Sequence, residues 1–237
     1  MGAVFSSELL KIRKKMIWFL IFLGPVGVVG LQSLNFGLRY DYLTKLHAAD
    51  LWGGLLDNIL FLTVPTLFVG LAIIASMTAG IEHQTNTWKQ TLALPVSRTR
   101  IFAGKFLLNV LLLFCSATLL IPGFIALGAA LGFPLEQLPY KRMLEAIYLS
   151  YIGVMPFIAL QVSLSVLFQH QAVSLMVGIA GTVISMFAFR FADWVPYKWV
   201  YLHLTANNPF YPAIAGIALG IALFLIGLLY FIRKDVN

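Results

Sequence analysis

Charge is what this sequence contains least of. Charged residues make up 11% of its 237 residues and hydrophobic residues 60%, whereas soluble domains hold about 25% charged and about 45–50% apolar residues. The apolar residues also fall in uninterrupted runs of membrane-spanning length. Both features exclude a soluble globular protein and predict an integral membrane protein.

Cysteine and the common catalytic motifs are equally scarce. Cys115 is the single cysteine, so no disulfide framework is possible, and we interpret it as a small buried hydrophobe. The phosphate-binding pattern GxxxxGK[ST] does not occur, because Phe106 follows the pair Gly104 and Lys105. HExxH is also missing. We therefore expect a chain that is not an enzyme, with no catalytic residue, no metal site and no cofactor of its own.

Six windows of the sequence contain no Asp, Glu, Lys or Arg. Most are at or above the ~18 to 20 residues that cross ~30 Å of hydrocarbon, and helices satisfy the backbone there without water. The absence of charge argues against a proton- or sodium-coupled transporter. We predict an all-α membrane protein, a single transmembrane domain over residues 1–237. Its six spans lie at about 17–38, 56–80, 105–131, 146–168, 172–189 and 212–232, the fifth being the shortest.

The basic residues indicate how the spans are oriented. If the cluster before the first span stays in the cytoplasm, six crossings place the loops at 82–105 and 170, and the C-terminus, on that same side. This side then carries the whole net charge of +7, as the positive-inside rule requires. We expect both termini in the cytoplasm of a bacterial cell. Anionic lipid explains the basic charge, and a nucleic-acid partner is not expected.

The segment 1–16 precedes the first span and predicts a short amphipathic helix. Leu9, Leu10 and Ile12 would face lipid, and the Lys/Arg cluster would face the headgroups. Such a helix either anchors the topology or forms an in-plane elbow. The predicted interfacial anchors of the whole chain are Lys11, Arg13, Lys14, Lys15, Trp194 and Trp199.

The polar insert GIEHQTNTWKQTLALPVSRTRIFAGK, residues 80–105, separates the second and third predicted spans. Asn86 can cap a helix over 87–94, which Pro95 would close, because the residue before proline leaves the helical region. Ser97 can begin a second helix that continues into the third span. We therefore predict a helix, a turn and a helix, which is more than a topological loop requires.

Two interpretations of this insert stay open on physical grounds. In the first, Trp88 sits at headgroup depth while Arg98, Arg100 and Lys105 bind lipid phosphate. In the second, the first helix is a protein contact that inserts Trp88 and neighbouring leucines into a groove of a partner.

A resemblance favours the second interpretation. The pattern IEHQTNTWKQTLALPVSR, residues 81–98, resembles permease subunits of the second class of ABC exporters, above all the bacitracin-resistance and lantibiotic-immunity permeases. Those subunits have six spans and a basic elbow, and typically carry E-x-x-x-x-T-W-K followed by P-x-S-R. The resemblance implies a coupling helix seated on a separate ATPase subunit that binds ATP and Mg. The implied contact residues are Glu82, Asn86, Thr87, Trp88, Lys89, Leu92 and Arg98.

The resemblance also implies how the chain works. The expected function is that of the transmembrane permease subunit of an ATP-driven exporter of amphipathic peptides or lipid-like antimicrobial compounds, with a role in immunity or resistance. Its partners would be the ATPase, membrane lipid, and a second copy or a related permease. The alternative is a non-transporting scaffold or sensor that recruits a soluble protein through its 81–100 loop.

The aromatic-rich segment 190–212, expected on the outer side, allows two interpretations as well. Its tryptophans and tyrosines form an interfacial belt or a substrate gate.

Overall fold

Helices are the regular structure of this chain. A computed structural model describes residues 2–13, 15–84, 96–202 and 210–233, and no strand occurs within those ranges. Five helical segments are long and apolar enough to cross a membrane, which confirms the prediction of an all-α, multi-pass membrane protein. They are α2 (Ile17–Leu38), α4 (Leu51–Gln84), α6 (Arg98–Ala130), the pair α7 (Tyr140–Gly153) and α8 (Met155–Leu167), and α11 (Tyr211–Arg233).

The predicted fifth span corresponds to α9 (Gln171–Ser185), which has only 15 residues. At 1.5 Å per residue it is about 22 Å long, less than the hydrocarbon thickness of about 30 Å. The six-span arrangement therefore stays a prediction. The remaining elements are short: α1 (Gly2–Ile12), α3 (Tyr40–Leu46), α10 (Pro196–Leu202), and the 3₁₀ turns η1 (Leu135–Gln137) and η2 (Ala188–Arg190).

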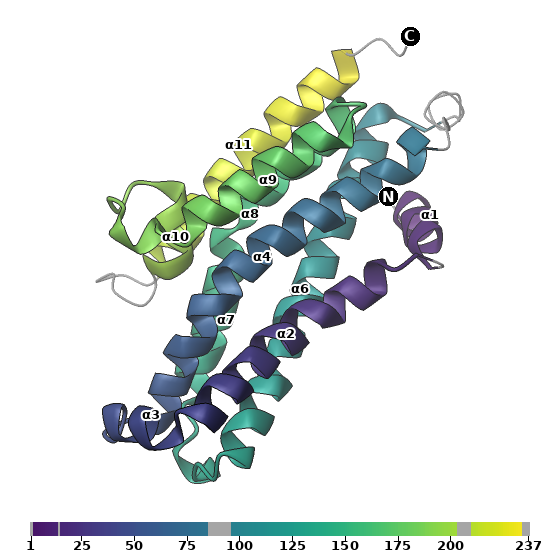
Figure 1. Cartoon of the computed structure of the whole chain (residues 1–237). Coiled ribbons are helices and arrows are strands. Elements are labelled where there is room, and N and C mark those ends of the chain that lie inside the picture. The colour runs from purple at the N-terminus through teal and green to yellow at the C-terminus, as the bar shows by residue number, and fades with distance from the viewer. Residues whose placement is uncertain (1, 14, 85–95, 203–209, 234–237) are drawn as a thin grey trace.

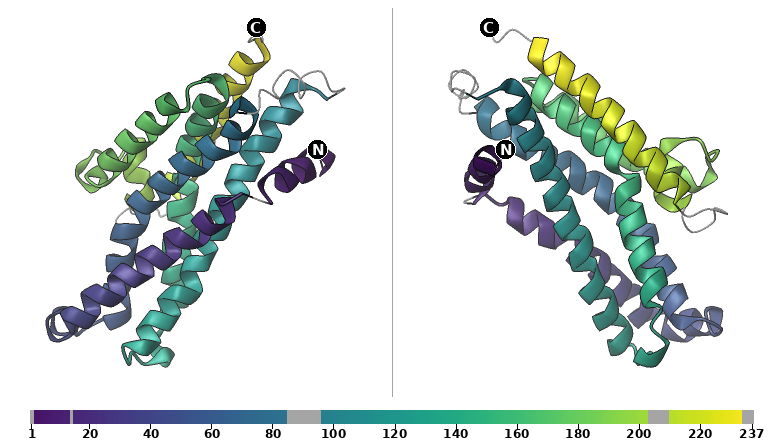
Figure 2. Two further views of the ribbon diagram at one scale, coloured as in Figure 1. Left: turned by 45° about the vertical axis from the view of Figure 1, so that its right-hand side comes forward. Right: turned by 180° about the vertical axis from the view of Figure 1, so that it is seen from behind.

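The helices run in an inclined bundle with two distinct ends (Figures 1 and 2). Helix α1, the end of α4, the start of α6 and the end of α11 gather at one end, which we call the α1 end. Helix α3 and the connection from α6 to α7 lie at the opposite end. Both extremities of the described chain therefore lie at the α1 end.

Helix α4 is the centre of the bundle, because it packs against α2, α6, α8 and α9. Near its start Trp52 is buried between the rings of Phe124 and Phe133, with its Nε1 donating to the backbone oxygen of Pro134 at 2.9 Å. Gly128 of α6 makes this possible, because a Cβ there would lie 2.2 Å from the Trp52 ring. A large aromatic residue thus locks α4 to α6 at the end opposite α1.

Helix α11 approaches the joint between α7 and α8 through glycines. A Cβ on Gly216 would lie 3.0 Å from the backbone oxygen of Ile152, and one on Gly220 would lie 3.3 Å from Met155. Small residues at a spacing of four allow such close helix contact in membranes. Gly216 and Gly220 therefore serve the packing of α11 against α7 and α8 of the same chain.

Candidate functional site

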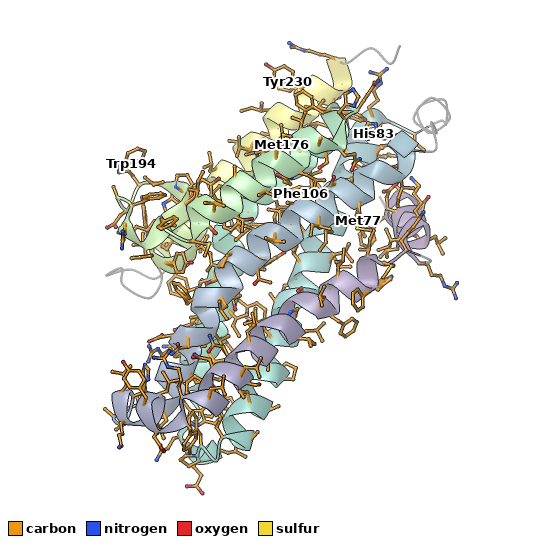
Figure 3. The ribbon with its side chains drawn as sticks, in the orientation of Figure 1. Met77, His83, Phe106, Met176, Trp194 and Tyr230 are labelled. Atoms are coloured by element: carbon orange, nitrogen blue, oxygen red, sulfur yellow. The ribbon has the colours of Figure 1, made fainter. Side chains whose placement is uncertain are left out.

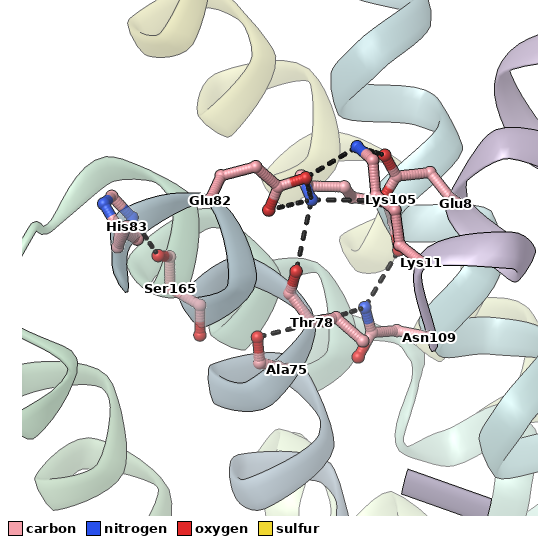
Figure 4. A network of polar contacts seen from close by, with 9 residues as sticks. All are labelled: Glu8, Lys11, Ala75, Thr78, Glu82, His83, Lys105, Asn109 and Ser165. Carbon is pink, nitrogen blue, oxygen red and sulfur yellow. Dashed lines mark hydrogen bonds and ion pairs between the residues drawn. The ribbon is translucent and has the colours of Figure 1, made fainter. Parts of the chain in front are cut away.

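Four charged side chains from three helices meet at the α1 end (Figure 4). We call Glu8 and Lys11 of α1, Glu82 of α4 and Lys105 of α6 the ion network. The Nζ atom of Lys105 donates to both carboxylate oxygens of Glu82 at 2.7 Å and to Oε2 of Glu8 at 3.0 Å. Lys11 donates to Oε1 of Glu82 at 2.8 Å and also pairs with Glu8. Each cation thus bridges both carboxylates.

The ion network is withdrawn from solvent. The side chains of Glu82 and Lys105 are 1% exposed, that of Glu8 is 4% exposed, and that of Lys11 is 29% exposed. An ion taken out of water costs several kcal/mol unless partners compensate its charge. Two carboxylates and two ammonium groups balance here, so the four charges can be buried together but not separately.

Neutral polar groups complete the surroundings of Lys105. Its Nζ also donates to the backbone oxygen of Thr78 at 3.2 Å, so the three ammonium hydrogens can all be engaged. Asn109, one turn further along α6, donates to the Thr78 hydroxyl at 3.1 Å and to the backbone oxygen of Lys105 at 2.9 Å. The bond to the Thr78 backbone oxygen directs the Lys105 ammonium group towards α4, and Asn109 joins the α6 backbone to the Thr78 side chain.

Lys11 forms the most exposed part of the ion network and remains charged near neutral pH. Burial lowers the pKa of Lys11, but its hydrogen bonds and its attraction to Glu8 and Glu82 outweigh burial and raise that pKa above the ordinary value for lysine. A positive charge on α1 is therefore maintained beside two carboxylates, which fastens α1 to the bundle.

The positions of Lys105 and Ile12 correct the sequence-based interpretation. Binding of lipid phosphate was one of the two interpretations open for Lys105, and Ile12 was expected to face lipid, yet each is 1% exposed. The second charge-free window ends at Ile81, so Glu82 was assigned to the loop, whereas Lys105 was already expected in the helix that begins after Ser97. In the structure α4 continues to Gln84 and α6 begins at Arg98, which places both charges inside helices. One sequence signal for this ion pair was available: Glu82 follows the second window and Lys105 precedes the third, and the two residues have opposite charges.

The predicted ATPase contacts divide into two groups. Asn86, Thr87, Trp88, Lys89 and Leu92, with the predicted helix over 87–94, lie outside the described residues. Glu82 and Arg98, at the two sides of that segment, are described. Glu82 is buried in the ion network, so its carboxylate does not lie on the surface as a direct contact would require.

Arg98 is the first residue of α6, and its Nη1 donates to the backbone oxygen of Ile232 near the end of α11 at 2.8 Å. Ser97 precedes α6 as predicted, but its hydroxyl makes no capping bond. A ring nitrogen of His83 lies 3.1 Å from the backbone oxygen of Ser165 in α8. Both sides of the 85–95 segment are thus tied to other helices of the bundle.

The predicted interfacial anchors also lie in different surroundings. Arg13 and Lys15 are exposed beyond α1, and Lys14 is outside the described residues. Trp194 is 74% exposed and projects away from the bundle (Figure 3). Trp199 is only 7% exposed, and its Nε1 donates to the backbone oxygen of Asp193 at 2.9 Å. Trp199 therefore packs within the chain, where an anchor would have to face lipid.

The aromatic segment reaches into the bundle through Tyr197. Its ring stacks on Phe68 of α4 at 5.4 Å between centroids and lies 4.4 Å from Phe157 of α8. Burial raises the pKa of Tyr197. Trp194 and Tyr197 therefore differ: one faces outwards and the other fills a space between helices.

The chemistry available at the ion network is structural. Its carboxylates already accept hydrogen bonds from its lysines, and among the described residues no group of three His, Cys, Asp or Glu side chains could hold a metal ion. What the network joins is more informative: α1, the end of α4 and the start of α6, the last two being the helices that flank the 85–95 segment.

Comparison with protein families gives a match over most of the chain. Residues 4–185 match a protein family described as "ABC-2 family transporter protein". No curated protein and no solved structure matches the chain. The matched range begins inside α1 and ends with α9, so it contains all four residues of the ion network.

Proposed function

Because this chain belongs to the ABC-2 transporter family, and is therefore a permease subunit of an ABC transporter, we propose that it acts as an ATP-driven exporter subunit worked through its 85–95 segment. The observation that carries this proposal is the ion network, which binds the flanks of that segment to one another and to α1. The ATPase that binds ATP and Mg is a separate partner.

The ion network supports coupling for a mechanical reason. If an ATPase displaces the 85–95 segment, the force reaches the bundle through the end of α4 and the start of α6. The bond from Lys105 to Glu82 makes these two ends one unit, and Lys11 and Glu8 add α1 to it. Because α4 packs against α2, α6, α8 and α9, a movement of that unit is passed to most of the membrane-spanning helices.

We further propose that the substrates are amphipathic peptides or lipid-like compounds, and that the physiological role is immunity or resistance of the bacitracin or lantibiotic type. Two observations support this choice: the six windows contain no Asp, Glu, Lys or Arg, and the residues 81–98 carry the pattern of those permeases. An apolar route suits a substrate that partitions into lipid.

Assembly and orientation complete the proposal. The permease pairs with a second copy or a related permease on two ATPase subunits in a bacterial cell membrane. Both chain ends face the cytoplasm, with α1 lying in the membrane plane as an elbow. The net charge of +7 on the α1 side supports this orientation, as does the position of both extremities at that end.

The test is co-purification with an ABC ATPase, taken from a neighbouring open reading frame that carries the phosphate-binding motif. We compare the wild type with Trp88→Ala and with the matched control Trp194→Ala, which removes an exposed tryptophan from another connection. Trp88→Ala should lower complex yield and ATPase stimulation, while Trp194→Ala should leave both unchanged. Equal yields for all three proteins would overturn the assignment of the contact. Recovery of a partner without a phosphate-binding motif, with no ATP-dependent transport in vesicles, would favour the scaffold or sensor.

A further inference from the structure

Helix α2 contains a proline whose effect is compensated by another helix. Pro25 lies inside α2 and has no N–H, so the backbone oxygen of Ile21, four residues earlier, lacks its helical donor. The hydroxyl of Ser116 in α6 donates to that oxygen at 3.0 Å. An interhelical hydrogen bond therefore replaces the one that the proline removes, in surroundings where an unsatisfied backbone group is costly.

Free space lies beside this bond. A cavity of about 40 Å³ between α2, α4 and α6 is lined by residues that include Gly24, Pro25, Thr66 and Ser116. A volume of this size holds water where polar partners are present, and the hydroxyls of Thr66 and Ser116 are such partners. A Cβ on Gly24 would lie 3.5 Å from Oγ of Ser116 and 3.6 Å from Cγ2 of Thr66. A change of bend at Gly24 and Pro25 can therefore use this free space, but it shifts those two side chains.

The half of α2 after Pro25 is fastened to the bundle. Nε2 of Gln32 donates to the backbone oxygen of Asn58 in α4 at 2.7 Å. Val29 packs so closely on α6 that a Cβ on Gly123 would lie 2.7 Å from it. Both contacts are on the side of the helix that faces α4 and α6, so this half is held in place.

The half of α2 before Pro25 is attached differently. It follows α1 within a few residues, and α1 belongs to the ion network through Glu8 and Lys11. Large side chains along it face outwards, among them Trp18, Phe19 and Phe22. Ile17 and Ile21 of this half are buried in the core, so its position depends on these two residues, on α1 and on the Ser116 bond. The other half is held in addition by the Gln32 bond to α4 and by the contact of Val29 with α6.

We propose that Gly24 and Pro25 form a hinge in α2, and that Ser116 is the positioning residue that holds the hinge in its resting bend. Movement of α1 with the 85–95 flanks then swings the first half of α2, while the second half stays with α4 and α6. The source of that movement rests on the proposed function, whereas the hinge itself can be tested in the permease alone.

The test measures distances between nitroxide labels in the purified permease, diluted with unlabelled protein so that only pairs within one chain contribute. Labels are placed at Phe19→Cys in α2 and Leu107→Cys in α6, both exposed, after Cys115→Ala removes the native cysteine. Ser116→Ala should broaden and shift this distance distribution, because the Ile21 oxygen loses its donor. The distribution should narrow again in Pro25→Ala/Ser116→Ala, because residue 25 then supplies its own N–H.

Three controls isolate the hinge. A second label pair at Leu34→Cys and Ala130→Cys, both exposed, reports the fastened half and should not change in any variant. Ser116→Thr retains the hydroxyl and should behave as the wild type. Thr66→Val removes another hydroxyl that lines the cavity, one that donates to the backbone oxygen of Leu62 within α4. Its effect on the distance distribution should be the same in the Pro25 and the Pro25→Ala backgrounds.

The outcomes separate the two proposals, because the measurement requires neither ATPase nor nucleotide. An unchanged distribution in Ser116→Ala, or equal broadening with and without Pro25, overturns the hinge and leaves the permease function standing. If Ser116→Ala does not yield monodisperse protein, recovery of monodisperse Pro25→Ala/Ser116→Ala supports the hinge, and its equal failure overturns it.

Discussion

The Nζ atom of Lys105 lies 2.7 Å from both carboxylate oxygens of Glu82, and each of the two side chains is 1% exposed. The two residues belong to different membrane-spanning helices and flank the segment proposed to meet the ATPase. Glu8 and Lys11 close the same network from α1. The contact between α1 and the bundle is therefore electrostatic as well as apolar.

The first prediction concerns the balance of charge in this network. Lys105→Met leaves Glu82 and Glu8 with a single cation, and breaking a buried pair by removing one partner costs about 3–5 kcal/mol. Glu82→Gln/Lys105→Met should be clearly more stable than Lys105→Met, because the neutral pair leaves Glu8 balanced by Lys11. Thermal unfolding of the purified variants in detergent measures the order of their stabilities.

A matched control is Lys141→Met, whose lysine is 89% exposed and lies 3.9 Å from Glu145. Exposed pairs of this kind contribute only about 0–1 kcal/mol. If Lys105→Met and Lys141→Met unfold at the same temperature, or if the double variant is the least stable of all, the burial of the network is wrong.

The second prediction concerns the packing of α4 on α6. Gly128→Ala adds a Cβ that would lie 2.2 Å from the Trp52 ring, and overpacking of this kind costs about 1–3 kcal/mol. Gly30→Ala is the control, since a Cβ there meets no atom within 4 Å, and it should change stability by less than about 1 kcal/mol. Equal unfolding temperatures for the two variants would contradict the Trp52 contact.

The third prediction concerns the crossing of α9. With six spans, the connection after α9 lies outside the cell, so Trp194→Cys in a Cys115→Ala background should react with a membrane-impermeant maleimide on intact cells. Arg13→Cys, exposed beyond α1 on the opposite side, should react only after the cells are opened. Labelling of Trp194→Cys only in opened cells would show that the 15 residues of α9 do not cross.

The class of this protein could be predicted from sequence because it depends on composition and run length alone. Uninterrupted apolar runs have one stable solution in lipid, the helix, and five of the predicted spans correspond to helices long enough to cross. The start of α6 after Ser97 was also predictable, because Pro95 ends any preceding helix locally. The family pattern in residues 81–98 is local as well.

The tertiary structure alone decided which charges meet. Lys11 and Glu82 are 71 residues apart, and Lys105 and Glu8 are 97 apart, so no local pattern joins them. A hydropathy window ends at a charge whether that charge faces water or a partner, which is why lipid phosphate was an open interpretation for Lys105. Trp199 was assigned to the interface for the same reason, since a tryptophan near a span end looks alike whether it faces lipid or a neighbouring helix.

The sequence by itself thus determined that the protein lies in a membrane and that it is helical. Both properties follow from the chemistry of single residues and their neighbours. The closed ion network at the α1 end, the Ser116 bond to the oxygen that Pro25 leaves unpaired, and the burial of Trp199 were decided only by tertiary packing. Each depends on the position of a side chain from a distant part of the chain, and packing alone sets that position.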